Sequence, residues 1–307
     1  MNVLAHLAAQ SQLVDRALDL YTDPARSEAR TEAPCFTAVP PRLLEAMRYS
    51  LMAGGKRLRP VLVIAAAELF GAPPERVMPA ACSLEMIHTY SLIHDDLPCM
   101  DDDDLRRGRP TNHKVYGEAM ATLAGDALLT MAFELLARQA QVEGVLPMQA
   151  VRAVAEVATA AGAAGMVGGQ VEDIDWEGRN ASPEQLQNIH RLKTGALFKA
   201  SLRAGAILAG ATDEDLAQLD RYALHFGLAF QIWDDVLDVI GDEAKTGKGV
   251  GRDLKHDKST YVSHYGLEGA KERARTEVAA ACAALESYGT RAAFLTELAR
   301  FVVDREG

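Results

Sequence analysis

The sequence predicts an all-α protein, and three observations indicate that class. Leucine and alanine recur at helical spacing through most of the chain, as in "LLEAMRYSLMAGG" at 43–55. Glycine and proline mostly stand between these runs, where they begin or end helices. No Asn-Gly or Asp-Gly pair separates stretches of alternating polar and apolar residues, so no β-hairpin is expected.

The first predicted helix is the amphipathic segment 1–21, which lacks the basic start and apolar run of a signal peptide. The segment 22–39, "TDPARSEARTEAPCFTAV", is the expected mobile loop. A helix at 43–55 follows and stops at a glycine pair. The next helix is predicted at 59–71, where Pro60 suits the first helical turn.

A longer helix is expected to begin near Pro79 and to end near Leu97, because Pro98 disfavours its continuation. No shift in composition marks a domain boundary and no repeat of 20–50 residues indicates a solenoid. We therefore expect a single domain over residues 1–307. The remaining predicted helices lie at about 117–141, 147–166, 183–209, 213–241 and 267–303.

Charge and composition exclude several classes of function. The net charge is 32 − 43 = −11, which disfavours binding of nucleic acid through general phosphate attraction. The four cysteines are scattered and form no CxxC pair, so we interpret them as reduced thiols of a cytoplasmic protein. No uncharged stretch reaches the length that spans a membrane, so we expect no membrane insertion.

Two acidic groups stand out in this chain. The stretch "SLIHDDLPCMDDDDLRRGRP" at 91–110 places aspartates at the predicted C-terminal end of a helix, where the helix dipole disfavours negative charge. The second group, "DDVLD" at 234–238, lies among large apolar residues and also near a helix end, and its first and last aspartates share a helix face. Solvated helix ends are the better interpretation of any one such group. Two groups, one of them in an apolar repeat, favour bound Mg²⁺ or a similar hard cation.

Basic residues accompany both acidic groups. The loop "GGKRLRP" at 54–60 leads into a predicted helix N-terminus, which suits an anion. Further basic residues follow in "LRRG", "RLKTG" and "KTGKGVGRDLKHDKST". Together with metal-type carboxylates, they indicate a polyanion such as a diphosphate, held partly through metal. No GxxxxGK[ST] follows a strand, so a P-loop is not the explanation.

Five motifs in order give the chain its family resemblance. They are GGKRLRP, the DDxxxxD at Asp95–Asp101 with LRRG behind it, GGQVEDI at 168–174, KTG at 193–195 and DDVLD at 234–238. The chain resembles the short-chain trans-prenyl diphosphate synthases, specifically bacterial-type farnesyl diphosphate synthases, with geranylgeranyl diphosphate synthases next. The resemblance implies the isoprenoid synthase fold, with ten or more helices around a deep central cavity, the two aspartate motifs facing each other across its mouth, and usually a homodimer.

The resemblance also implies roles for individual residues. Asp95, Asp101 and Asp234 would bind three Mg²⁺ ions, for which Mn²⁺ could substitute, while Asp96, Asp235 and Asp238 would support them or act through water. Gln170 and Asp173 would lie near the metals. The isopentenyl diphosphate site would comprise Lys56, Arg59, His88 and Arg107. The allylic diphosphate site would comprise Arg106, Lys193, Thr194, Gln231, Lys248 and Lys258.

The implied reaction joins isopentenyl diphosphate head to tail with dimethylallyl or geranyl diphosphate. The metal ions and cationic side chains would stabilise the departing diphosphate, which later accepts the proton. Tyr90, with Ser91 beside it, would help form the floor of the chain pocket, and an aromatic residue there favours a farnesyl product. The alternative is a geranylgeranyl product. A terpene cyclase would carry a different second metal motif, and a non-catalytic synthase subunit would typically lose one aspartate motif.

Overall fold

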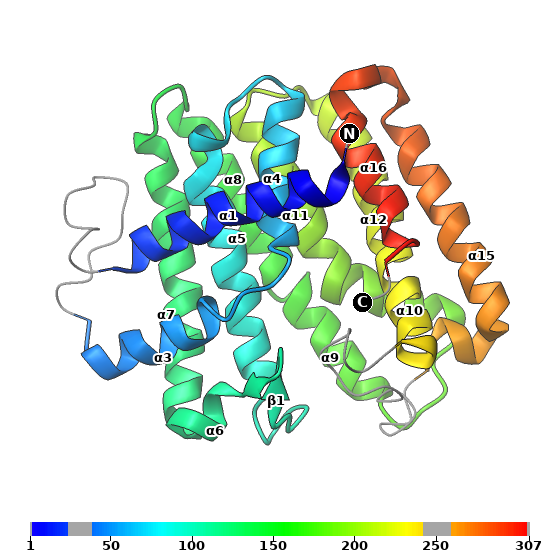
Figure 1. The fold of residues 1–307 in the computed structure, drawn as a ribbon, viewed down its shortest axis with the longest axis horizontal. Coiled ribbons are helices and arrows are strands. Elements are labelled where there is room, and N and C mark those ends of the chain that lie inside the picture. The colour runs from blue at the N-terminus through cyan, green and yellow to red at the C-terminus, as the bar shows by residue number, and fades with distance from the viewer. Residues whose placement is uncertain (1, 24–38, 242–258, 306–307) are drawn as a thin grey trace. The chain divides into compact units, whose positions relative to one another are not determined.

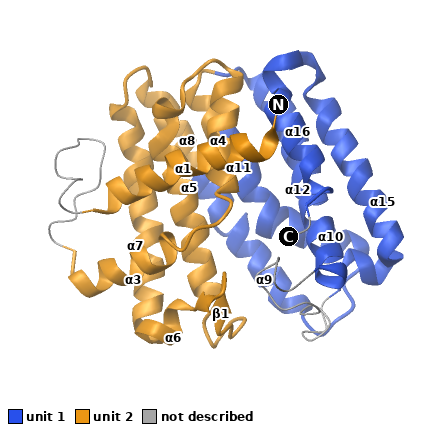
Figure 2. Cartoon of the chain, in the orientation of Figure 1, with its two compact units in different colours: residues 1, 156–203, 211–307 blue, residues 2–155, 204–210 orange. Residues whose placement is uncertain are grey.

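The computed structural model describes residues 2–23, 39–241 and 259–305, and within them the all-α prediction is confirmed (Figure 1). The chain divides into two compact units (Figure 2). We call residues 2–155 and 204–210 the N-terminal unit, and residues 1, 156–203 and 211–307 the C-terminal unit. The single domain and the deep central cavity stay predictions, as does the mobile loop, because most of 22–39 lies outside the described residues.

The N-terminal unit is built around a helix buried along most of its length, α5 (Pro74–Asp95), which packs against α4 and α7. Gly125 of α7 allows a close approach to the end of α5, because a Cβ there would lie 2.2 Å from His94 Nε2. This contact fixes the end of α5 that carries the first acidic group. The other elements are α1 (Val3–Thr22), α3 (Pro41–Leu51), α4 (Leu58–Leu69), β1 (Leu105–Arg106), β2 (Arg109–Pro110), α6 (Asn112–Tyr116), α7 (Glu118–Ala137) and a 3₁₀ turn (Arg138–Gln141).

Helix α5 begins earlier than the sequence predicted. It begins at Pro74, which stands at the first helical position, and Pro79 lies inside the helix. The expectation of a start near Pro79 is therefore wrong: Pro74 fits the first helical position, where an N–H group has no partner within the helix, and Pro79 stands in the second turn although it lacks an N–H donor. The predicted end is confirmed within two residues, since Asp96 is the C-cap.

A short hairpin follows the first acidic group and was not expected. Strands β1 and β2 pair antiparallel around Arg107 and Gly108, which have φ angles of 54° and 72°. Two positive φ values in a two-residue turn are typical of a type I′ hairpin, for which Asn-Gly is the usual signal. Here an Arg-Gly pair forms the turn, so the expectation of no hairpin is wrong.

The C-terminal unit centres on α12 (Asp213–Ile240) packed against α15 (Tyr261–Ala284). The run predicted at 267–303 is not one helix, because Gly289 has a φ of 57° in the 3₁₀ segment that separates α15 from α16. The run predicted at 183–209 contains a π-helical turn, and α9 was not predicted as a separate helix. The other elements are α9 (Met166–Trp176), α10 (Pro183–His190), the π turn (Arg191–Gly195), a 3₁₀ segment (Glu286–Ala292) and α16 (Ala293–Val302), while α8 (Pro147–Ala161) and α11 (Ala196–Leu208) have residues in both units.

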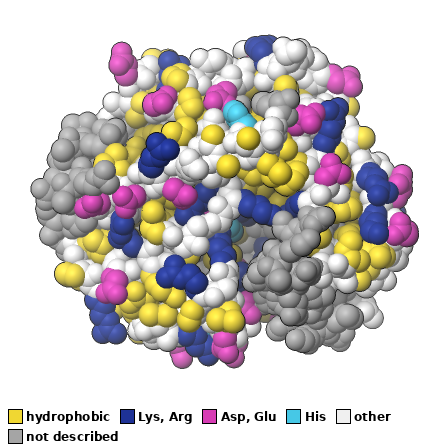
Figure 3. Space-filling view, in the orientation of Figure 1, with side chains coloured by type: hydrophobic (Ala, Val, Ile, Leu, Met, Phe, Trp, Pro, Cys, Tyr) yellow, Lys and Arg dark blue, Asp and Glu magenta, His cyan; other side chains and the backbone are white. Residues whose placement is uncertain are grey.

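Two helical stretches of the described chain, 118–141 and 147–176, are long and apolar enough to cross a membrane by length and composition alone. Core helices of soluble proteins pass the same test, so this is weak evidence for a membrane protein. On the face shown in Figure 3, acidic and basic side chains are interspersed with apolar ones.

Candidate active site

The first acidic group is folded back onto the end of α5. Asp95 is the last residue of the helix, and its carbonyl oxygen accepts a hydrogen bond from the backbone N–H of Asp101 at 2.8 Å. Asp102 adopts a left-handed conformation with φ 49°, and its N–H bonds to the Leu97 carbonyl at 3.2 Å. The loop therefore brings the first and last aspartates of DDxxxxD together at one end of α5.

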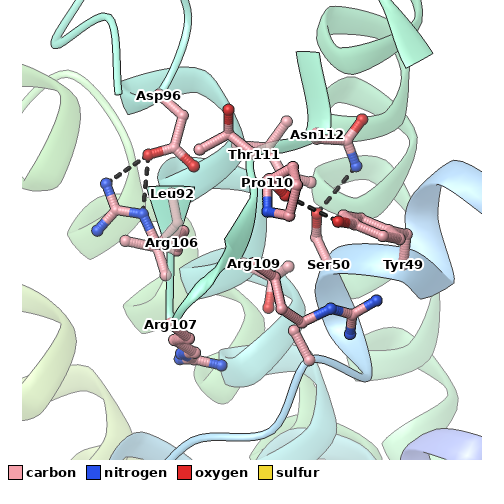
Figure 4. Close-up of a pocket in the computed structure, with 13 residues that line it drawn as sticks. Tyr49, Ser50, Leu92, Asp96, Arg106, Arg107, Arg109, Pro110, Thr111 and Asn112 are labelled. Carbon is pink, nitrogen blue, oxygen red and sulfur yellow. Dashed lines mark hydrogen bonds and ion pairs between the residues drawn. The ribbon is translucent and has the colours of Figure 1, made fainter. Parts of the chain in front are cut away.

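The buried Asp96 forms an ion pair with the half-buried Arg106 next to this loop (Figure 4). Arg106 Nε donates to Asp96 Oδ1 at 2.8 Å, and its second nitrogen also bonds to Asp103 at 3.2 Å. Burial raises the pKa of Asp96, while the hydrogen bonds from Arg106 oppose that shift. Burial also lowers the pKa of Arg106, but the bonds and charges of Asp96 and Asp103 outweigh it and raise the pKa overall. Asp96 thus orients a guanidinium that stays charged.

The hairpin that carries Arg106 is anchored to α3 by residues that line a pocket in the N-terminal unit (Figure 4). Tyr49 Oη donates to the Pro110 carbonyl at 2.8 Å, and the Arg109 guanidinium lies 4.5 Å from the Tyr49 ring centre. Asn112 Nδ2 donates to Ser50 Oγ at 2.9 Å. The two contacts of Tyr49 hold the hairpin against α3, and the bond of Asn112 joins α6, which follows the hairpin, to the same helix.

In GGKRLRP, Gly55 leaves space for the side chain of a second hairpin arginine, Arg107. Arg107 donates to the Gly54 carbonyl, and a Cβ on Gly55 would lie 2.6 Å from the Arg107 guanidinium carbon. Burial lowers the pKa of Arg107, which indicates a cation that is only partly compensated by nearby carboxylates. Such a group gains from a bound anion. Beside it in the same loop, Lys56 is exposed and Arg59 half-buried.

Helix α5 also carries the three predicted residues that precede Asp95. His88 is half-buried, and its carbonyl accepts a hydrogen bond from Ser91 Oγ at 2.9 Å. Tyr90 is 6% exposed, and its ring meets the edge of His94 at a centroid distance of 5.7 Å. Burial, with the charge of Asp95 second, raises the pKa of Tyr90 to about 12, so its hydroxyl stays protonated at neutral pH. Its role in chain length stays a prediction.

In the C-terminal unit, α9 and the π turn bring GGQVEDI and KTG together. Lys193 Nζ pairs with Asp173 at 2.7 Å. Gly169 makes this approach possible, because a Cβ there would lie 2.3 Å from the Lys193 backbone nitrogen. Single π-helical turns often occur at functional sites, and this one shifts the positions of Lys193 and Thr194 relative to a regular helix.

A series of hydrogen bonds leads from the π turn to the second acidic group. Thr194 Oγ1 donates to Gln231 Oε1 at 2.6 Å, and Gln231 Nε2 contacts Asp234 Oδ2 at 3.3 Å. The other oxygen of Asp234 accepts from Arg305 at 2.7 Å. Arg305 is 8% exposed, and its guanidinium lies 4.0 Å from the Phe230 ring centre.

Arg305 is a residue that sequence reasoning missed. The interpretation of DDVLD rested on its apolar neighbours and its place near a helix end, whereas its partner arginine comes from a distant part of the sequence. Its only sequence signal is its place in the closing "FVVDREG", which does not reveal its partner.

The remaining aspartates of DDVLD differ in their surroundings. Asp235 is buried, and its Oδ2 accepts the N–H of Tyr261, the first residue of α15, at 2.7 Å. A carboxylate at a helix N-terminus is favoured by the helix dipole, so Asp235 links α12 to α15. Asp238 is half-buried, one turn after Asp234. Lys248 and Lys258 lie outside the described residues.

The donor set suits Mg²⁺ that is shared with a substrate. Within the described residues, no three His, Cys, Asp or Glu side chains are close enough to hold an ion alone. Mg²⁺ is usually bound by one or two carboxylates, with substrate phosphates and waters completing its six ligands, so aspartates in small groups fit it. The Oε1 of Gln170 on α9 is buried and accepts no hydrogen bond from the described residues, and it could accept one from a metal-bound water.

Comparisons with known proteins show which family this chain resembles. The family model described as polyprenyl synthetase matches residues 40–291. The chain is 45% identical over 306 residues to a farnesyl diphosphate synthase of Geobacillus stearothermophilus, covering 100% of this chain and 99% of the relative. It is 48% identical over 267 residues to a geranylgeranyl diphosphate synthase of Cyanophora paradoxa, covering 87% and 88%.

A solved structure supports the same assignment. The apo structure of an FPP/GFPP synthase from Zymomonas mobilis matches with a TM-score of 0.83 and 37% identity, covering 98% of this chain and 99% of that one. This similarity confirms the isoprenoid synthase fold that the motifs implied. The family model covers most of the chain and the relatives match it over most or all of its length, so this chain belongs to the polyprenyl synthetase family.

Proposed function

We propose that this chain is a prenyltransferase that extends allylic diphosphates with isopentenyl diphosphate, in a head-to-tail reaction that requires Mg²⁺, and that its main product is farnesyl diphosphate. One observation carries the proposal: the chain is 45% identical over its whole length to a relative named farnesyl diphosphate synthase, with both aspartate motifs intact. Dimethylallyl and geranyl diphosphate are the proposed allylic substrates.

The metal site is assigned to the two acidic groups. Asp95, Asp101 and Asp234 would hold three Mg²⁺ ions, or Mn²⁺ in their place, with Asp238 acting through water. Asp96 and Asp235 would act by orienting Arg106 and the start of α15, given their present hydrogen bonds. When bound, Mg²⁺ stabilises the negative charge that develops on the departing diphosphate.

Substrate phosphates are assigned to the basic groups. Lys56, Arg59 and Arg107, with His88, would bind isopentenyl diphosphate, and the partly compensated charge of Arg107 supports this. The allylic diphosphate would be bound by Arg106, Lys193, Thr194, Gln231, Lys248 and Lys258.

In the proposed reaction, the allylic C–O bond breaks and its electron pair leaves with the diphosphate. The cationic side chains that bind this group stabilise the charge on it as the bond breaks. The double bond of isopentenyl diphosphate then attacks the allylic carbocation, and a proton is lost to the released diphosphate. Apolar residues around Tyr90 would exclude water from the cation.

The second candidate product is geranylgeranyl diphosphate, since a relative at 48% identity carries that name. The buried ring of Tyr90 favours the shorter product. A homodimer, a cytoplasmic location and a single domain complete the proposal.

The test is incubation with isopentenyl diphosphate and each of dimethylallyl, geranyl and farnesyl diphosphate, with Mg²⁺ or with a chelator. We expect a C15 product from the first two starters and no product with the chelator. A predominant C20 product would support the alternative. Product formed without isopentenyl diphosphate would indicate a cyclase, and no chain growth under conditions that support a known synthase would contradict the proposal.

A further inference from the structure

The loop GGKRLRP contains an arginine that faces the protein interior. Arg57 is 2% exposed, although the residues on either side of it in the loop are exposed or half-buried. Its φ of 48° is in the left-handed region, which is uncommon for a residue with a side chain. Strain of this kind persists only when the surrounding contacts impose it.

Those contacts come from three different helices. Arg57 Nε donates to Asp15 Oδ1 of α1 at 2.8 Å, and one terminal nitrogen donates to Glu85 Oε1 of α5 at 2.6 Å. The other terminal nitrogen donates to the carbonyl of Leu51, at the end of α3, at 2.8 Å. One side chain thus joins α1, α3 and α5 to the loop.

Glu85 is as deeply buried as its partner. It is 1% exposed, and it lies on α5 three residues before His88. Burial lowers the pKa of Arg57, but the bonds and charges of Glu85 and Asp15 outweigh that effect, so the guanidinium stays charged. A buried ion pair is a poor means of gaining stability, because apolar residues of the same volume often stabilise as well or better. Stability alone therefore does not explain why Arg57 and Glu85 form a buried ion pair.

The geometry of the loop supplies that explanation. Arg57 is the N-cap of α4, which begins at Leu58, so Arg59 lies in the first turn of that helix. On the other side, the carbonyl of Lys56 accepts a hydrogen bond from Ser11 Oγ of α1 at 3.0 Å. With its backbone fixed on both sides of Arg57, the loop directs the Lys56 side chain outward to solvent.

We propose that Arg57 is a positioning residue for isopentenyl diphosphate, acting with Glu85 to fix Lys56 and Arg59 in the loop relative to His88 on α5. The inference rests on the proposed function, since that function assigns these three residues to the isopentenyl site. Arg57 is too buried to touch the substrate. Most residues assigned to the allylic diphosphate lie in the C-terminal unit. We therefore expect the loss of Arg57 to weaken binding of isopentenyl diphosphate and not of the allylic substrate.

The first test compares KM values for the two substrates in Arg57→Lys, Arg57→Gln and Glu85→Gln. We expect KM for isopentenyl diphosphate to rise about tenfold or more in Arg57→Gln. A tenfold rise corresponds to a loss of about 1.4 kcal/mol of binding free energy. The KM for geranyl diphosphate should change less than about twofold. Arg57→Lys keeps the charge but not the fork of three donors, so we expect an intermediate rise.

A double variant separates positioning from stability. Arg57→Gln with Glu85→Gln leaves no unpaired buried charge, so its melting temperature should exceed that of either single variant. Its KM for isopentenyl diphosphate should stay raised, because two amides cannot also reach Asp15 and the Leu51 carbonyl. Recovery of KM together with stability would show that the pair has only a structural role and would overturn the inference.

Arg48→Gln is the matched control. Arg48 of α3 also pairs with α1, through Asp19 at 2.6 Å, and its side-chain hydrogen bonds go to α1 rather than to the loop. We expect it to lower the melting temperature without changing either KM. Equal rises in both KM values for the Arg57 variants, or no rise in a folded Arg57→Gln, would contradict the inference.

Calorimetric titration with isopentenyl diphosphate separates failure of the inference from failure of the proposed function. A wild-type protein that binds this ligand without chain growth would contradict the proposed function. In that case weaker binding by Arg57→Lys would still support the positioning role, and unchanged binding would overturn it. A wild-type protein that neither elongates nor binds would overturn both.

Discussion

Arg305 pairs with Asp234, the carboxylate that we propose as a metal ligand. The Arg305 guanidinium occupies Asp234 Oδ1 at 2.7 Å, while Gln231 contacts the other oxygen at 3.3 Å. A metal ion at Asp234 must therefore share or displace the arginine. This competition depends on one ion pair, so a single substitution can test it.

We expect Arg305→Met to bind Mn²⁺ in the presence of pyrophosphate more tightly, by about fivefold. That factor corresponds to about 1 kcal/mol of charge interaction at a half-exposed carboxylate. Isothermal titration calorimetry measures it directly. Arg300→Met is the control, because Arg300 is on the neighbouring α16 and pairs with Glu297 at 2.5 Å. Weaker binding in Arg305→Met would instead show that the arginine orients Asp234 for the metal.

Tyr90 determines product length if the proposed floor of the chain pocket is correct. Its ring is 6% exposed and lies five residues before Asp95 on α5. Tyr90→Ala removes most of the side chain, so we expect products longer than C15 by one or more five-carbon units. Chromatographic sizing of the dephosphorylated products measures this. Tyr116→Ala, at a half-buried ring on α6, should leave product length unchanged, and the same distribution in both variants would contradict the assignment.

At the scale of elements, close helix contacts position the site, and glycines make them possible. The backbone of α9 approaches the π turn at Gly169, where a Cβ would lie 2.3 Å from the Lys193 nitrogen. Because that atom belongs to the backbone, it cannot rotate away as a flexible side chain would. Any larger residue must displace the segment that carries Lys193 and Thr194.

We therefore expect Gly169→Ala to lower the free energy of unfolding by about 1–3 kcal/mol, as overpacking of a core does. It should also raise KM for geranyl diphosphate more than KM for isopentenyl diphosphate, since Lys193 and Thr194 are assigned to the allylic site. Denaturant unfolding and steady-state kinetics measure the two effects. Gly269→Ala on α15, where the nearest atom to a Cβ is 3.2 Å away on Tyr265, is the control. A stable Gly169→Ala with unchanged kinetics would contradict the role of this contact.

Elements with a strong helical period could be predicted from the sequence, whereas irregular ones could not. The end of α5 followed from Pro98, and the end of α12 followed from Gly241, because both residues act on the backbone locally. The hairpin was missed because Arg107 takes a positive φ that is fixed by its contact with the loop at Gly54. Tertiary contacts of this kind leave no local signal.

At the scale of the whole molecule, the same distinction applies to the candidate site. The acidic and basic motifs could be found because each concentrates unusual charge in a few consecutive positions. The partners of those charges could not be found, because Arg305 and Glu85 come from distant parts of the sequence. Motif order therefore predicted the family and its chemistry, while the interactions that orient each residue required the structure.

Ligand binding to both acidic groups should stabilise the whole protein, because a ligand that binds only the folded state shifts unfolding by mass action. We expect Mg²⁺ with pyrophosphate, at about 100 times the dissociation constant, to raise the melting temperature by about 5 °C over the chelator-treated protein. Differential scanning fluorimetry measures this shift. Asp95→Asn and Asp234→Asn should each abolish most of it, because each removes a carboxylate assigned to the metal. Glu214→Gln, an exposed acidic residue in the first turn of α12, should keep the full shift. A full shift in both aspartate variants would contradict the metal assignment, and a shift lost in only one of them would restrict the ions to that acidic group.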